Sequence, residues 1–231
     1  MAHSETVDRI LDAAEILFAE KGFSETSLRM ITSKAGVNLA AVNYHFGSKN
    51  ALIQAVFSRF LGPLSHLMEQ GLKEHGWHQP GAEKPQLEDI IRLYVYGLVR
   101  IPTSHPNGVA VFMRLMGLAY TQSQGHLRKY LEQEYSRTFR LFMDLVKQST
   151  PELTSRERFW RIQFTIGSVA FTMSSMQQLT EIYENSVDAK ADPQKVVGYL
   201  VPYLLAGLKA APRDLVSKSV GPASSQSSLK E

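Results

Sequence analysis

Three adjacent side chains that can hydrogen-bond, Asn43, Tyr44 and His45, lie between two apolar residues, Val42 and Phe46. In a helix Val42 and Phe46 share the face that packs against the protein, and the trio then points away from that face. An amide, a phenol and an imidazole can donate hydrogen bonds to phosphate oxygens, and the amide can also pair with a base edge. We interpret the stretch as a nucleic-acid-binding surface. The alternative interpretation is an ordinary polar patch on a helical bundle.

A lysine in the first turn of the following helix supports this interpretation. We expect Ser48 to begin that helix, and Lys49 then opposes the helix dipole, so local stability alone would favour an acid there. The free N–H groups at the start of the helix, together with Lys49, instead form a phosphate site. Thr26 and Ser27, with Arg29 beside them, are expected to form a similar site at the start of an earlier helix.

Three shorter helices and one long helix are expected to position these side chains. Apolar residues recur with helical spacing across 5–21, and further helices are expected over 26–34, 38–46 and 49–70. Gly36 supplies a tight turn between the second and the third. Two helices joined by a turn of about four residues are typical of a helix-turn-helix motif. We therefore expect residues 1–50 to form a DNA-binding domain.

The charge distribution agrees with this expectation only locally. The net charge is +3, which does not by itself indicate a nucleic-acid partner. Residues 26–50 contain three basic side chains and no acidic ones, next to an acidic segment over residues 1–25. Such a window is typical of a small anion-binding surface, although chance on a solvated face explains the charges equally well.

The remainder of the chain is expected to be helical. Helices are predicted over 87–100, 108–119, 124–148, 155–184 and 194–210, and because no alternating strand pattern occurs, the fold class is all-α. Residues 51–211 would form a second, larger domain, and the serine-rich residues 212–231 a disordered tail. The uncharged stretch 162–180 is rich in polar residues, and 196–208 is shorter than the roughly 20 residues that a bilayer requires. We expect a cytoplasmic protein with no membrane segment.

The segment "SLRMITSKAGVNLAAVNYHFGSKNAL" resembles the signature of the TetR family of bacterial transcriptional regulators. The resemblance implies an N-terminal three-helix DNA-binding unit, a larger all-helical ligand-binding and dimerisation domain, and a homodimer. It also implies DNA contacts by Ser27, Arg29, Asn38, Ala40, Ala41, Asn43, Tyr44, His45 and Lys49. Many members have tyrosine where this chain has Asn43, so the base preference does not carry over.

Longer stretches resemble the fatty-acid-responsive members of that family. They include "ALIQAVFSRFLGP" and "FMRLMGLAYTQSQGHLRKYLEQEY". This resemblance implies a repressor of fatty-acid degradation genes that a long-chain fatty acid or acyl-CoA releases from double-stranded DNA. Two alternatives remain open: a repressor that responds to a different hydrophobic molecule, such as a drug, or an apolar-ligand module that binds no DNA.

Aromatic and methionine side chains in the second domain are expected to form an interior that adapts to an apolar ligand. The candidate ligand-binding residues are Phe112, Met113, Met116, Phe164 and Phe171, with Arg92 for a carboxylate, although each is also typical of ordinary core or surface. Small residues are expected to bring helices together at the dimer interface, where the candidates are Gly167, Ala170, Ser174, Gly198 and Ala206. A dimer would place two recognition helices about 34–36 Å apart on a palindromic operator.

Enzymatic activity is not expected. The chain lacks cysteine and the nucleophile, zinc-protease and phosphate-loop motifs that would indicate catalysis. His75 and His78 are three residues apart without a third ligand nearby, so no metal site is expected either. We expect no cofactor.

Overall fold

The computed structural model describes residues 2–77, 85–122, 124–187 and 193–211. Every regular element in those ranges is an α-helix, which confirms the all-α prediction. The helices are α1 (Ala2–Glu25), α2 (Leu28–Ala35), α3 (Leu39–Phe46), α4 (Lys49–Glu74), α5 (Leu87–Val99), α6 (Gly108–Thr121), α7 (Gly125–Gln148), α8 (Ser155–Ser174), α9 (Met176–Val187) and α10 (Pro193–Lys209). The predicted tail lies outside the described residues.

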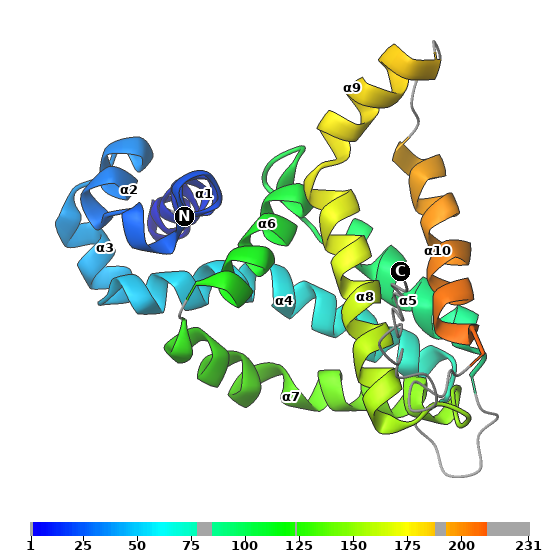
Figure 1. Ribbon diagram of the computed structural model, residues 1–231. Helices are drawn as coiled ribbons and strands as arrows, with labels where there is room; N and C mark the ends of the chain where they lie inside the picture. The colour runs from blue at the N-terminus through cyan, green and yellow to red at the C-terminus, as the bar shows by residue number, and fades with distance from the viewer. Residues whose placement is uncertain (1, 78–84, 123, 188–192, 212–231) are drawn as a thin grey trace, which may run out of the picture.

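Helices α1, α2 and α3 pack together into an N-terminal unit at one end of the molecule (Figure 1). Its centre is apolar, with Phe18, Ile31 and Val42 fully buried and Phe23 almost so. The rings of Phe18 and Phe23 lie 5.5 Å apart. Burial of these side chains, rather than the intrinsic stability of such short helices, holds α2 and α3 in place.

The starts of three helices follow the local capping signals in the sequence. The side chains of Ser27, Asn38 and Ser48 accept hydrogen bonds from the N–H groups of Met30, Ala41 and Ala51. Each cap satisfies one of the free N–H groups at its helix start.

Two glycines permit the turns of the N-terminal unit. Gly36, at φ 64° and ψ 38°, ends α2 in the left-handed conformation that the tight turn requires. Gly22 has a positive φ of 83°, but its ψ of 169° lies outside the left-handed helical region, and helical structure continues to Glu25. Two helical segments of α1 therefore meet in a kink at Gly22, so the first segment ends where predicted, although Gly22 is not in the left-handed helical conformation.

The larger part of the molecule is built from α4 to α10. Helix α4 leaves the N-terminal unit and packs against α5 and α7, while α10 packs against α5 and α8. Helix α6 contacts both α1 and α8, and so connects the two parts of the molecule (Figure 1). Among the described helices, none combines the length and apolar character that crossing a bilayer requires.

The helix predicted over 155–184 is wrong in one respect, because the chain breaks it near Ser175. The N–H of Ser175 donates to the carbonyl of Phe171, and α9 then starts at Met176. The hydroxyl of Ser174 also donates to the carbonyl of Phe171, at 3.2 Å. Serine side chains compete for helix carbonyls in this way, and the break occurs here without proline or glycine.

Candidate nucleic-acid interface

The outer face of α3 carries the side chains that the sequence singled out. Asn38, Ala40 and Asn43 are exposed, and Tyr44 leaves 78% of its surface accessible. Val42, on the opposite side of the same helix, is completely buried. The helix therefore presents an amide, a phenol and a small methyl group outwards from a rigid support. Such a face can enter a major groove and contact base edges and phosphates.

Two other predicted residues of α3 lie at the edge of this face. Ala41 and His45 are half-buried. The ring of His45 lies 5.1 Å from that of Tyr44, edge to face. His45 therefore supports the outer face as well as belonging to it.

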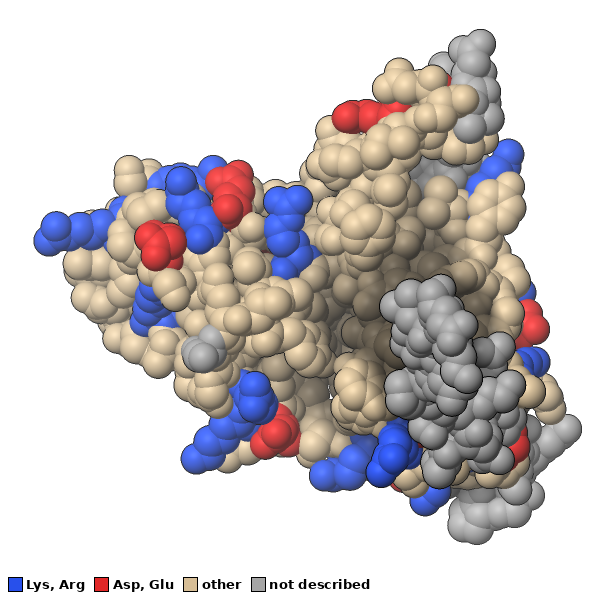
Figure 2. All heavy atoms as spheres, in the orientation of Figure 1, with Lys and Arg blue, Asp and Glu red and all other residues tan. Residues whose placement is uncertain are grey.

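Polar and basic groups flank α3 on both sides. Ser27 and Arg29 are exposed at the start of α2. Lys49, half-buried at the start of α4, donates from Nζ to the carbonyl of Ser24 at 3.3 Å. Figure 2 shows basic side chains projecting from the end of the molecule formed by α2 and α3. The result is an outward face with cations around it, as contact with a phosphate backbone requires.

The prediction that Thr26 contacts a phosphate is wrong. Its side chain is fully buried, and its hydroxyl donates to the carbonyls of Leu17, at 3.0 Å, and Gly22, at 2.8 Å. The hydroxyl therefore ties the end of α1 to the start of α2 and cannot reach a phosphate. Two neighbouring residues were both suited to cap α2, and packing assigned that role to Ser27 alone.

The turn of the helix-turn-helix is held from α1. Arg9 Nη2 donates to the carbonyls of Ala35, at 2.5 Å, and Gly36, at 2.9 Å. A Cβ atom on Gly36 would lie 2.7 Å from the same nitrogen. Nothing in the local pattern of the sequence indicated this contact, because Arg9 lies 26 positions from Ala35.

The structure does not bring the six predicted ligand-binding residues into one interior. Phe112 and Met113 are buried, and the ring of Phe112 stacks on that of Phe60 at 4.9 Å. Phe164 and Phe171 instead expose 65% and 62% of their surface on α8. The prediction that they line an interior pocket is wrong. An apolar stripe on a helix can pack against its own chain or against another chain, and the sequence does not distinguish the two.

Two further members of that set lie elsewhere. Met116 is half-buried on α6. Arg92 is exposed and pairs with Glu88 on the same helix, at 2.8 Å. It lies at a surface groove of about 500 Å³ between α4 and α5, which Tyr96 and Arg100 also line. Its guanidinium is therefore not in an enclosed apolar pocket.

Exposed aromatic side chains cover the outer face of α8 and α10. Besides the two phenylalanines of α8, Trp160, Tyr199 and Tyr203 leave more than half of their surface accessible. The predicted small residues Gly167, Gly198 and Ala206 are exposed on these two helices, whereas Ala170 and Ser174 are half-buried. A monomer rarely exposes so many large apolar groups together, so this face is suited to a protein partner.

Comparisons with known proteins agree with the geometry of both parts. Residues 10–56 match the family described as "Bacterial regulatory proteins, tetR family". Residues 92–207, half of the chain, match the "Tetracyclin repressor-like, C-terminal domain". The chain belongs to the TetR family. YttP of Bacillus subtilis (strain 168), a probable HTH-type transcriptional regulator, is 41% identical over 64 residues, which are 28% of this chain and 31% of YttP. The chain thus matches about a third of this relative's length.

Solved structures of TetR-like fold extend the similarity over most of the chain. FadR from Bacillus halodurans, a fatty acid degradation regulator, aligns with a TM-score of 0.57 and 18% identity, over 88% of this chain and 96% of FadR. NalD, the secondary repressor of the MexAB-OprM multidrug efflux pump in Pseudomonas aeruginosa, aligns with a TM-score of 0.53 and 22% identity, over 88% and 95%. At these identities the similarity establishes the TetR fold alone.

A charged cluster that the sequence pattern did not predict lies at the junction between the two parts of this TetR-family protein. Arg59 of α4 donates to the carboxylates of Asp12, at 2.6 Å, and Glu15, at 3.0 Å. The acids Asp8, Asp12 and Glu15 recur at intervals of four and three residues, which places them on one face of α1. That spacing could have indicated an acidic stripe, but not its basic partner on another helix.

Proposed function

We propose that this TetR-family regulator is a homodimeric repressor that binds a palindromic double-stranded operator through α3. The observation that carries the proposal is the exposed outer face of α3, with Asn43 and Tyr44 held outwards by the buried Val42. Ser27, Arg29, Asn38, Ala40, Ala41, His45 and Lys49 complete the proposed DNA contacts. Base contacts would come from α3, and phosphate contacts from the starts of α2 and α4.

Binding to the DNA upstream of the protein's own gene tests this function. Fluorescence anisotropy at several salt concentrations should show specific binding, and Tyr44→Ala should weaken it at least tenfold. Because Tyr44 is exposed and contributes little to the core, the variant should still fold. Lys49→Ala should weaken binding to all sequences and lower the salt slope by about one. Lys147→Ala, which removes an exposed cation in the last turn of α7, is the matched control for charge. Binding that none of these substitutions changes would contradict the assignment of α3.

Dimerisation is proposed to use the exposed face of α8 and α10. Phe164 and Phe171 project from α8, and Tyr199 and Tyr203 from α10. Phe171 and the two tyrosines line a groove of about 400 Å³ between these helices. The predicted interface residues Gly167, Ala170, Ser174, Gly198 and Ala206 lie on the same two helices. Sedimentation of Phe171→Glu should shift the protein from dimer to monomer, whereas Phe139→Glu, on α7, should leave it dimeric. A monomeric wild-type protein would refute the proposal.

The effector is proposed to be a long-chain fatty acid or acyl-CoA, and the regulated genes those of fatty-acid degradation. Support comes from the sequence resemblance to the fatty-acid-responsive regulator PsrA. It also comes from the similar structure of FadR, which is a fatty acid degradation regulator. A coupling free energy of about 1–3 kcal/mol between effector and DNA would lower the affinity for the operator roughly 5–150-fold.

A titration of the protein–DNA complex with fatty acids and acyl-CoAs of increasing chain length tests the effector. Release should increase with chain length and be absent for the shortest acids. Release by efflux substrates instead would favour the alternative effector class; NalD, which has the same fold, is the secondary repressor of a multidrug efflux pump. If the protein binds no DNA duplex at any salt concentration, the third class is favoured, an apolar-ligand module without DNA binding.

A further inference from the structure

One face of α1 is acidic and meets a single arginine of α4. Arg59 Nη1 lies 2.6 Å from Asp12 Oδ1 and 3.0 Å from Glu15 Oε1, and Nη2 lies 3.7 Å from Asp8 Oδ1. Glu15 is almost fully buried, and Arg59 leaves about a quarter of its side chain accessible. Ion pairs shielded from water in this way are less weakened by salt than pairs on an open surface.

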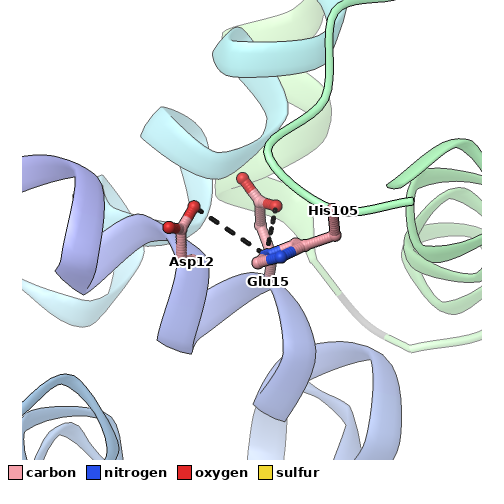
Figure 3. Close-up of side chains that lie close together, drawn as sticks. All are labelled: Asp12, Glu15 and His105. Carbon is pink, nitrogen blue, oxygen red and sulfur yellow. Dashed lines mark ion pairs between the residues drawn. The ribbon is translucent and has the colours of Figure 1, made fainter. Parts of the chain in front are cut away.

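A third segment of the chain closes on the same acids. Ser104, in the connection between α5 and α6, donates from Oγ to Asp12 Oδ1 at 2.7 Å. His105 follows, with Nε2 at 3.8 Å from Asp12 Oδ1 and 3.9 Å from Glu15 Oε2 (Figure 3). This nitrogen is buried and has no hydrogen-bond partner among the described residues. The carboxylates of α1 therefore face both α4 and the α5–α6 connection.

The cluster does not require a metal ion. Asp12, Glu15 and His105 place three possible ligand atoms within 4.8 Å of one another. However, Arg59 already donates to both carboxylates, including the Asp12 oxygen nearest to His105. The guanidinium supplies the positive charge that a bound cation would bring, and its contacts would have to break before an ion could enter.

The same connection leads into α6, the helix that packs on both α1 and α8. At the far end of α6, Gln122 accepts a hydrogen bond through Oε1 from the N–H of Phe23, at 3.1 Å. Both ends of α6 are thus attached to α1 by polar contacts. Polar contacts depend on geometry more strongly than apolar packing does, so a small shift of α6 would break them.

We propose that Arg59, Asp12 and Ser104 form a latch that fixes α1 on α4 and on the α5–α6 connection, and thereby sets operator affinity. The inference rests on the proposed function, since it assumes that the N-terminal unit binds DNA. With the latch closed, the two N-terminal units of a dimer keep one separation. With it open, they sample many separations, and the fraction of dimers that fits two half-sites falls.

Two substitutions and one control test the latch. Ser104→Ala removes one hydrogen bond from an exposed connection and leaves Arg59 paired. Arg59→Gln removes the charge from α4. The control is Arg137→Gln, which removes an exposed arginine on α7. Operator affinity by anisotropy should fall about threefold to tenfold for the two latch variants and less than twofold for the control.

Hydrogen exchange provides a readout that is independent of DNA. Amides of residues 8–15 and 101–107 should lose protection in Ser104→Ala, relative to wild type and to the control. Unchanged protection in these segments together with unchanged operator affinity would overturn the latch. If the wild-type protein binds no DNA, the proposed function fails, and loss of protection then decides separately whether the latch contacts exist. If Arg59→Gln does not fold, Ser104→Ala alone decides the question.

Discussion

Replacing Glu15 by glutamine would measure the electrostatic cost of burying an acid at the junction of α1 and α4. Burial raises the pKa of Glu15 from 4.5 to about 7, although Arg59 favours the charged form. Nearby Asp12 differs: burial raises its pKa, but hydrogen bonds from Ser104 and Arg59 outweigh that effect and lower it. Glutamine has the shape of glutamate and can still accept a hydrogen bond from Arg59, but it does not titrate.

The direction in which Glu15 changes stability with pH follows from proton binding. Between pH 4.5 and about 7 the folded protein keeps the Glu15 proton while the unfolded chain has lost it, so the stability contributed by Glu15 falls as pH rises. At about 1.4 kcal/mol for each pH unit, the loss across this interval is about 3 kcal/mol. Asp12 acts in the opposite direction and below its ordinary pKa, so its titration lies outside this window.

Urea unfolding of wild type and Glu15→Gln at pH 4.5, 6 and 8, at one protein concentration, provides the assay. The free energy of unfolding of wild type relative to the variant should decrease by about 3 kcal/mol from the lowest to the highest pH. A constant difference over this range would refute the reasoning and show that Arg59 keeps Glu15 charged throughout. Arg137→Gln, measured in parallel, controls for the loss of a distant charge.

Four other substitutions test the packing and the backbone conformation of the protein. Thr26→Val should lower the free energy of unfolding, measured with urea, by about 1–2 kcal/mol, because two carbonyls lose a hydrogen-bond donor. The operator affinity of the folded protein, measured by anisotropy, should not change. Phe112→Ala should cost about 3–5 kcal/mol by leaving a cavity against Phe60, measured by the same unfolding curves. Gly36→Ala should destabilise the N-terminal unit in thermal unfolding through its φ of 64° and its approach to Arg9. Gly117→Ala, at an open helical site, should leave stability unchanged or raise it by about 0.5–1 kcal/mol.

The sequence was informative where structure is decided locally. The caps at Ser27, Asn38 and Ser48 depend on contacts three residues along the chain. The helices after Asn38 and Ser48 start where these caps predicted, whereas the sequence left Thr26 and Ser27 both open as the cap of α2. The turn at Gly36 needs a positive φ that glycine readily adopts. The outer face of α3 followed from the same spacing that buried Val42.

Features that depend on distant parts of the chain could not be predicted in this way. Thr26 has the residue type of a phosphate contact, but contacts with residues four and nine positions earlier bury its hydroxyl. Phe164 and Phe171 have the spacing of a core stripe, which is also the spacing of an interface with another chain. Arg59 meets Asp12 across 47 positions, and no periodicity in the sequence joins them.

The way in which α3 is supported has an evolutionary consequence. The structure describes this helix in full, and Val42 is its one fully buried residue. Its position is fixed by the burial of Val42, by the contact of Arg9 with the preceding turn and by the cap at Asn38. Exposed positions such as Asn43 and Tyr44 can therefore be exchanged at little cost in stability. New operator preferences can arise by mutation at this face while the same scaffold persists, so gene duplication could diversify regulation without first redesigning the fold.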